Sequence, residues 1–193
     1  MNQKMTPEDL KAQGFDVVLL GIGAEAITPN IPGVDQEHVY SVEDVLEGRV
    51  SLEEKTVAVI GSGLTGLEVA ELLQTKGNKT FVVEMQDSLA PGAYAQNFMD
   101  VMSRMKPELS EYLTSQKLVA IREDKIELED MKTQQLTTKA VDAVVLSVGY
   151  KANEALLDSF KDVADTVEVI GDAKDVKNIG LATRSGYQTA LKL

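Results

Sequence analysis

The six residues Gly61-Ser62-Gly63-Leu64-Thr65-Gly66 constrain the fold of this chain more than any other feature of its sequence. They follow residues 56–60, a short apolar run typical of a buried strand, and they lead into residues 64–77, whose apolar side chains recur at helical spacing. A strand, a glycine turn and a helix in this order predict the first unit of an α/β fold with a parallel sheet.

Each glycine of the turn has a separate physical task. Gly61 permits the tight bend after the strand, Gly63 lets a diphosphate approach the backbone without a Cβ in the way, and Gly66 lets the helix pack closely on the sheet. The first turn of the helix then offers free amide donors and the positive end of its dipole. The turn therefore predicts a dinucleotide-binding site.

Glu84 indicates which dinucleotide is bound, because it follows the next predicted strand at residues 80–83. A carboxylate at this position accepts hydrogen bonds from the adenosine ribose and repels a phosphate on that ribose. The next residues, Met85-Gln86-Asp87, supply no arginine or lysine to pair with such a phosphate. We therefore expect NADH to be preferred over NADPH, with Met85 among the residues that contact it.

The rest of the chain continues the α/β pattern. Residues 15–24 form an apolar run closed by glycines, and we expect a strand that is buried on both faces of a parallel sheet. A long helix is predicted over residues 94–115, with a kink or a break at Pro107. Further strands are predicted at residues 141–148 and 166–170, a small antiparallel excursion at residues 119–121, 125–128 and 135–139, and a final helix at residues 178–191.

Composition excludes several classes of function. Lys and Arg total 19 against 31 Asp and Glu, a net charge of −12, which disfavours nucleic acid as a partner. The chain has no cysteine, so it has no thiol nucleophile, disulfide or cysteine-held metal centre. Its apolar runs are far shorter than the roughly 20 residues that cross a bilayer. The N-terminus lacks an apolar signal core, and we expect a soluble, cytoplasmic protein.

Taken together, these segments resemble the pyridine-nucleotide half of the pyridine nucleotide-disulfide oxidoreductase superfamily. Within it the chain is similar to the C-terminal region of the NADH:flavin oxidoreductases, which include 2-enoate reductase, 2,4-dienoyl-CoA reductase and trimethylamine dehydrogenase. Residues 59–68 and 82–85 carry the likeness to the NADH domain. The likeness to the FAD domain and to the crossings between the domains rests on residues 15–24, 31–33, 41–48, 146–150 and 169–173.

The resemblance implies a domain organisation. A Rossmann-like three-layer NAD(P)-binding domain is expected at residues 49–149, flanked by partial FAD-domain segments at residues 1–48 and 150–193. Gly149 then lies at the return to the FAD domain, and Gly171 and Asp172 approach the flavin in an intact parent protein. In this chain half of that flavin site is missing, and Asp172 is equally well explained as a turn or capping residue.

The resemblance also implies that the chain is a piece of a larger enzyme, with Met1 an introduced or chance start. The FAD fingerprint, the FMN barrel and the iron–sulfur cysteines of the family have no counterpart in it. We expect the parent to pass hydride from NADH to a flavin, and the piece to bind NADH without oxidising it. The strands left uncovered by the missing domains are expected to expose an apolar patch, through which the chain self-associates.

Two other classes of function stay open. A non-catalytic NADH-sensing module would use the same turn, although such sensors generally add a DNA-reading or interaction domain that is not apparent here. An S-adenosylmethionine-dependent methyltransferase usually has an acidic residue at the start of its glycine turn, and Ile60-Gly61 has none. His38, the only histidine, is expected to be a solvated loop residue. The substrate of the parent enzyme is not predicted.

Overall fold

The computed structural model describes residues 3–193, so the expected chance start at Met1 lies outside the described residues. The chain divides into two compact units. The larger unit is the continuous segment Ile27–Gly149, and the smaller unit combines both ends of the chain, Met1–Ala26 and Tyr150–Leu193.

A five-stranded sheet forms the centre of the larger unit, and all of its strand pairs are parallel. The chain runs from β4 outward to β5 and β6 and then returns to β10 on the other side of β4. The strand order therefore reverses beside β4, which is where open α/β sheets bind their ligands. In spatial order the strands are β3 (Val39–Ser41), β10 (Ala143–Leu146), β4 (Thr56–Ile60), β5 (Lys79–Val83) and β6 (Ser110–Leu113).

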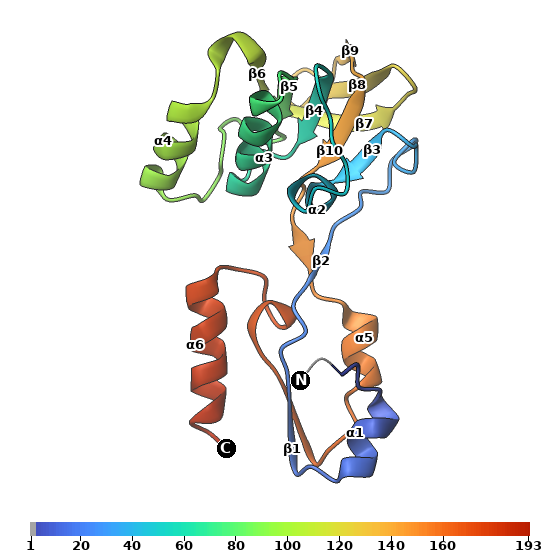
Figure 1. The fold of residues 1–193 in the computed structure, drawn as a ribbon, viewed down its shortest axis with the longest axis vertical. Helices are drawn as coiled ribbons and strands as arrows, with labels where there is room; N and C mark the ends of the chain where they lie inside the picture. The colour runs from blue at the N-terminus through green and yellow to red at the C-terminus, as the bar shows by residue number, and fades with distance from the viewer. Residues whose placement is uncertain (1–2) are drawn as a thin grey trace. The chain divides into compact units, whose positions relative to one another are not determined.

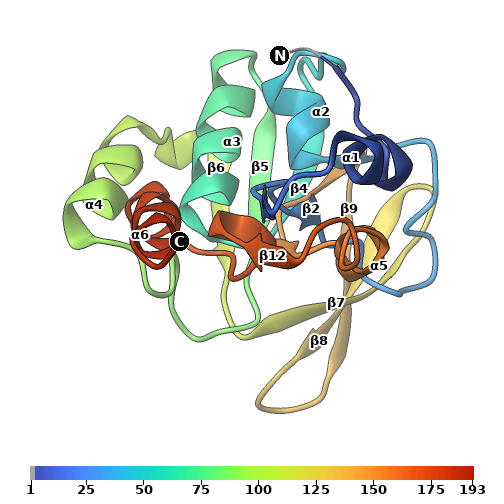
Figure 2. The same cartoon turned by 90° about the horizontal axis from the view of Figure 1, so that it is seen from below.

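Two further layers cover this sheet (Figures 1 and 2). Three helices lie on one face: α2 (Val42–Leu46), α3 (Leu64–Thr75) and α4 (Ala95–Arg104). An antiparallel sheet lies on the other: β7 (Gln116–Ile121), β8 (Lys125–Asp130) and β9 (Leu136–Ala140). Val57 and Val59 of β4 pack toward the helices, whereas Ala58 and Ile60 pack toward the antiparallel sheet. The predicted three-layer α/β fold with an antiparallel excursion is confirmed.

The predicted helix over residues 94–115 is wrong beyond α4. After α4 the chain forms a short 3-10 turn, Pro107–Leu109, and then the strand β6. Pro107 has no amide hydrogen and cannot continue a helix, and the next residues pair in parallel with β5, from Thr80 opposite Ser110 to Val83 opposite Leu113. Pairing with a strand distant in sequence overrides the local helical pattern.

The larger unit also begins earlier than the predicted domain boundary at residue 49. β3 pairs with β10, and Val42 and Val45 of α2 are buried in the core beneath the helices. The compact unit therefore starts at Ile27. The assignment of the flanking segments to an FAD domain stays a prediction.

The smaller unit is built on two parallel strands, β1 (Val17–Leu20) and β12 (Thr166–Val169). Their inner face packs on Phe160 and Val163. The other elements are α1 (Pro7–Gln13), the antiparallel pair β2 (Glu25–Ala26) and β11 (Tyr150–Lys151), α5 (Glu154–Ser159), the 3-10 turn Gly171–Ala173 and α6 (Ile179–Ala190). The helix α6 corresponds to the final helix predicted at residues 178–191, and Asn178 is its N-cap residue.

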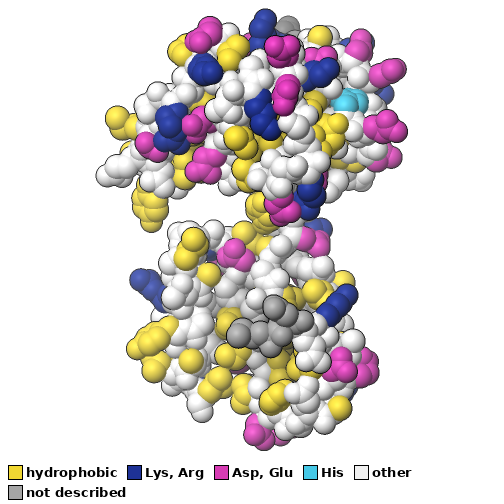
Figure 3. Space-filling view, in the orientation of Figure 1, with side chains coloured by type: hydrophobic (Ala, Val, Ile, Leu, Met, Phe, Trp, Pro, Cys, Tyr) yellow, Lys and Arg dark blue, Asp and Glu magenta, His cyan; other side chains and the backbone are white. Residues whose placement is uncertain are grey.

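The expectation that the first strand is buried on both faces is wrong for this chain. Val18 and Leu20 are buried, whereas Val17 and Leu19 are 37% and 41% exposed. Only one face of this two-stranded sheet is covered by the described residues. Figure 3 shows further apolar side chains at the surface of this unit. All-parallel sheets are normally covered on both faces, so the outer face of β1 is unusual for its type.

The side chain of Asn78 connects three segments of the larger unit through hydrogen bonds. Its side chain is fully buried and makes three hydrogen bonds: Oδ1 accepts from the Lys55 amide at 2.9 Å, and Nδ2 donates to the carbonyl oxygens of Leu52 at 2.7 Å and Leu73 at 2.8 Å. These bonds join the approach to β4 with the end of α3, just before β5.

Replacing Asn78 by alanine should lower the free energy of unfolding of the larger unit by about 2–4 kcal/mol, because the Lys55 amide and the buried Leu52 carbonyl oxygen lose their hydrogen bond and the Leu73 carbonyl oxygen loses one of several. Denaturant unfolding measures the change. Asn97→Ala is the matched control, since Asn97 is an exposed residue of α4. Equal stability of the two variants would show that these buried bonds contribute nothing.

Candidate nucleotide-binding site

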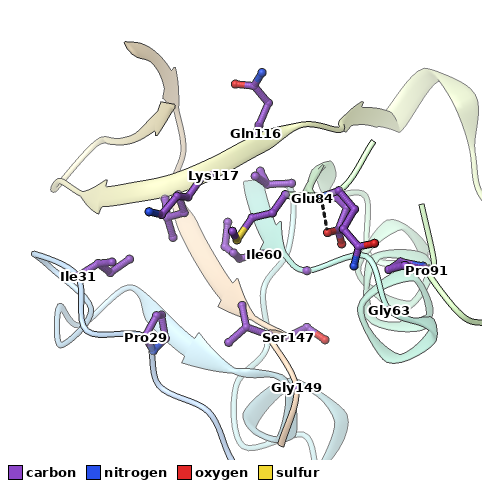
Figure 4. Close-up of a pocket in the computed structure, with 16 residues that line it drawn as sticks. Pro29, Ile31, Ile60, Gly63, Glu84, Pro91, Gln116, Lys117, Ser147 and Gly149 are labelled. Atoms are coloured by element: carbon purple, nitrogen blue, oxygen red, sulfur yellow. Dashed lines mark hydrogen bonds between the residues drawn. The ribbon is translucent and has the colours of Figure 1, made fainter. Parts of the chain in front are cut away.

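A cavity of about 440 Å³ opens at the carboxyl ends of β4, β5 and β10 (Figure 4). It thus lies where the strand order of the sheet reverses. Its lining is predominantly apolar, with a small number of polar groups, as expected of a small-molecule site. The lining residues are Pro29, Ile31, Ile60, Gly61, Gly63, Val83, Glu84, Met85, Gln86, Pro91, Gln116, Lys117, Leu118, Ser147, Val148 and Gly149.

The three glycines of the turn have different surroundings. Gly61 has a φ of +98°, and a Cβ there would lie 2.2 Å from the carbonyl oxygen of Ser147. At Gly66 a Cβ would lie 2.1 Å from the carbonyl oxygen of Gly61. A Cβ on Gly63 would meet no atom within 4 Å. The protein itself therefore requires glycine at the first and third positions, whereas Gly63 borders open space in the cavity.

The start of α3 leaves backbone donors available beside this open space. Gly63 is the N-cap residue, and no side chain caps the first turn. The amides of a helix N-terminus lack partners within the helix and carry the positive end of its dipole. An anion placed over Gly63 would therefore meet a favourable field and free N–H groups.

Glu84, which follows β5, is hydrogen-bonded to the same glycine turn through its carboxylate. Its Oε2 accepts hydrogen bonds from the Ser62 amide at 3.0 Å and from the Ser62 hydroxyl at 2.7 Å, and its Oε1 accepts from the Gln86 amide at 2.9 Å. The Ser62 hydroxyl in turn accepts from the Ala90 amide at 3.1 Å. These bonds use most of the acceptor capacity of the carboxylate.

The surroundings keep Glu84 ionised. Burial alone raises the pKa of this carboxyl group, but hydrogen bonds from the Gln86 and Ser62 amides and from the Ser62 hydroxyl outweigh it and lower the pKa below 4.5. The cavity therefore holds a fixed negative charge at neutral pH.

The structure brings together five of the residues predicted for the site: Gly61, Gly63, Glu84, Met85 and Gly149 all line the cavity. Ser62 is fully buried and acts on the cavity only through Glu84. Leu64, Thr65 and Gly66 belong to the first turn of α3 and do not line the cavity.

Gly171 and Asp172 belong to the smaller unit. Asp172 accepts a hydrogen bond from the Lys177 amide at 3.3 Å, as a turn residue would. Gly171 has a φ of +63° and donates its amide to the Ser185 hydroxyl at 3.2 Å, which joins the turn to α6. A flavin contact of either residue stays a prediction.

Sequence reasoning missed the residues that reach the cavity from other parts of the fold. Pro29 and Ile31 come from the loop before β3, and Gln116, Lys117 and Leu118 come from β7. No local motif marks these positions, because only the tertiary fold brings them to the turn. The expectation for His38 is also corrected: this residue is half-buried, and its Nε2 is shielded from solvent and has no hydrogen-bond partner among the described residues.

Residues 2–173 match the family described as pyridine nucleotide-disulphide oxidoreductase. Among curated relatives, the chain is 32% identical to an NADH oxidase of Thermoanaerobacter brockii and 30% identical to a cinnamate reductase of Clostridium sporogenes. These alignments cover 96% and 98% of the chain but only 29% and 28% of the relatives. The chain thus spans less than a third of the length of these relatives.

Solved structures show the same fold. A 2-naphthoyl-CoA reductase complex matches with a TM-score of 0.87 and 26% identity, over all of this chain and 29% of that protein. Thioredoxin reductase of Lactococcus lactis matches with a TM-score of 0.70 at 18% identity, over 91% of this chain and 63% of that protein, which is a likeness of fold alone.

Residues 3–193 contain neither a membrane-spanning helix nor a cluster of metal-binding side chains. No helix there combines the length and the apolar character needed to span a bilayer. The same residues hold no group of three or more histidine, cysteine, aspartate or glutamate side chains arranged to bind a metal ion.

The lowered pKa of Glu84 predicts how stability depends on pH. Because the folded pKa lies below 4.5, the charged form stabilises the fold above that pH, and the contribution is lost as the pH falls through the folded pKa. The gap in free energy of unfolding between the native chain and Glu84→Gln should therefore be largest at neutral pH and shrink below pH 4.5. Denaturant unfolding across this range measures it.

The exposed Glu68 provides the control for this measurement. Glu68→Gln should give a small gap that is nearly constant over the same pH range, because that side chain lies in water. A Glu84→Gln gap that stays constant with pH would contradict the role of the carboxylate charge.

Proposed function

Because the chain belongs to the pyridine nucleotide-disulphide oxidoreductase family, we propose that it is the NADH-binding region of a flavin-dependent oxidoreductase. The observation that carries this proposal is the open space over Gly63, between the uncapped start of α3 and the carboxylate of Glu84. The same cavity thus combines an anion-binding element with an acceptor for hydroxyl groups.

The geometry supports one direction for a bound dinucleotide. Its diphosphate fits over Gly63, where the helix amides are free and no Cβ intervenes. Its adenosine ribose then lies toward Glu84 and Met85, and its nicotinamide toward Ser147 and Gly149 at the end of β10. When bound, NADH supplies a hydride, and the residues of this chain position it.

The preference for NADH over NADPH rests on the charge of Glu84. The lowered pKa keeps this carboxylate ionised, so a phosphate on the neighbouring ribose would be repelled at short range. Its hydrogen bonds to Ser62 and Gln86 hold the charge in place. We therefore propose discrimination through fixed charge, with a smaller contribution from direct hydrogen bonds to the ribose.

The hydride acceptor is proposed to be a flavin held by further domains of a parent protein. The curated relatives are named an NADH oxidase and a cinnamate reductase, and the chain spans less than a third of each. The outer face of β1, with Val17 and Leu19 exposed, is proposed to pack against the rest of the FAD domain. Self-association of the isolated chain through this face stays a prediction.

The alternatives have less support. Membership of the family favours pyridine-nucleotide binding over methyl transfer from S-adenosylmethionine. An NADH sensor needs a surface through which it signals to a partner, and no such surface is identified among the described residues.

Gly63→Ala should weaken NADH binding at least about tenfold, because the new methyl group would occupy the space of the diphosphate. Thermal stability should change little, since that methyl group meets no protein atom within 4 Å. Calorimetric titration with NADH, NADPH and S-adenosylmethionine, combined with thermal unfolding, measures both effects. Binding of S-adenosylmethionine in place of NADH by the native chain would refute the proposed function.

The purified chain should bind NADH yet oxidise it no faster than background, even when FAD is added, because the flavin site is proposed to need other domains. The absorbance of NADH at constant temperature follows the reaction. Turnover that increases with the concentration of the chain would show that these residues hold a working flavin site by themselves.

A further inference from the structure

The cavity has a simple balance of charge. Of its lining residues only Glu84 and Lys117 have charged side chains. Glu84 is committed to Ser62 and Gln86 through its hydrogen bonds. No hydrogen bond or ion pair of the Lys117 ammonium group exists among the described residues, and its cross-strand neighbour, Glu129 on β8, forms none with it. Lys117, an exposed residue, is therefore a cation among the lining residues that has no partner in the described protein.

The position of Lys117 is set by backbone hydrogen bonds to the same segment that carries Glu84. The Gln116 amide donates to the Glu84 carbonyl oxygen at 2.8 Å, and the Ser115 amide donates to the Gln86 carbonyl oxygen at 2.7 Å. The start of β7 is thus fixed along the wall of the cavity. In Figure 4 the Lys117 ammonium group lies on the Ile31 side of the cavity, across from Glu84, while the Gln116 side chain extends from the opposite side of the strand.

A bound dinucleotide would bring two negative charges into a cavity that already contains one at Glu84. The glycine turn offers only neutral amides and a helix dipole equivalent to roughly half a positive charge. An ammonium group that reaches the diphosphate from the other side would offset the repulsion, and a charge-assisted hydrogen bond is stronger than a neutral one.

We propose that Lys117 is a phosphate-binding residue whose ammonium group pairs with the diphosphate of the bound dinucleotide, across the cavity from Gly63. This inference rests on the proposed function. It assigns the diphosphate a two-sided site, with the amides at the start of α3 on one side and a side chain of β7 on the other. A phosphate on the adenosine ribose is the other phosphate that a lysine here could meet, and the ionised Glu84 argues against it.

Titrations of the full chain with adenosine, ADP, NADH and NADPH separate these cases. Lys117→Met should weaken ADP and NADH about ten- to a hundredfold, leave adenosine within about twofold, and reduce the salt dependence of NADH binding. Lys132→Met is the control, because Lys132 is exposed, lies outside the cavity and changes the net charge equally. It should leave all four affinities nearly unchanged.

Several outcomes would overturn the inference. Unchanged affinity of Lys117→Met for NADH, an equal loss for adenosine, or a loss confined to NADPH would each show that the ammonium group does not pair with the diphosphate. Absence of NADH binding by the native chain would refute the proposed function and this inference together. Normal NADH binding by the native chain with no effect of Lys117→Met would refute the inference alone.

Discussion

The contact between Glu84 and Ser62 holds two parts of the cavity wall in place. It joins the end of β5 to the glycine turn after β4, so that two adjacent strands end in one rigid structure. Ser62 extends this structure to Ala90, within the connection between β5 and α4. A buried carboxylate is tolerated because three short hydrogen bonds replace its hydration. The charge that we propose to select among ligands is therefore also the charge that holds the turn.

Only part of the site could be predicted from the sequence. The spacing between the glycine turn and Glu84 predicted that they would meet, and in the structure they do. The three glycines were also predicted with their separate tasks, and their surroundings agree: two would clash with the backbone, and Gly63 is open. These features are local or follow from one strand–turn–helix unit, which makes them visible in a single sequence.

Features that depend on distant contacts were not visible. Residues 110–113 read locally as helix, yet they form β6 because β5 offers an edge for pairing. Lys117 entered the cavity because backbone bonds place β7 beside the segment after Glu84, a fact that no nearby motif reveals. Likewise, the sequence predicts that β1 is covered on both faces, and only the elements packed against it show that the face of Val17 and Leu19 is exposed. In each case the missing information was the identity of a partner remote in sequence.

The larger unit begins and ends at one place, since the amide of Ile27 donates to the carbonyl oxygen of Gly149 at 2.9 Å. A segment whose two ends are hydrogen-bonded to each other can be removed from a host chain, or inserted into another, without leaving a gap that the backbone must bridge. The segment Ile27–Gly149 is continuous in sequence and its two ends are adjacent in space, so it has the properties of an insertable domain. The whole segment could therefore be exchanged between proteins, by evolution or by engineering, while their other domains stay unchanged.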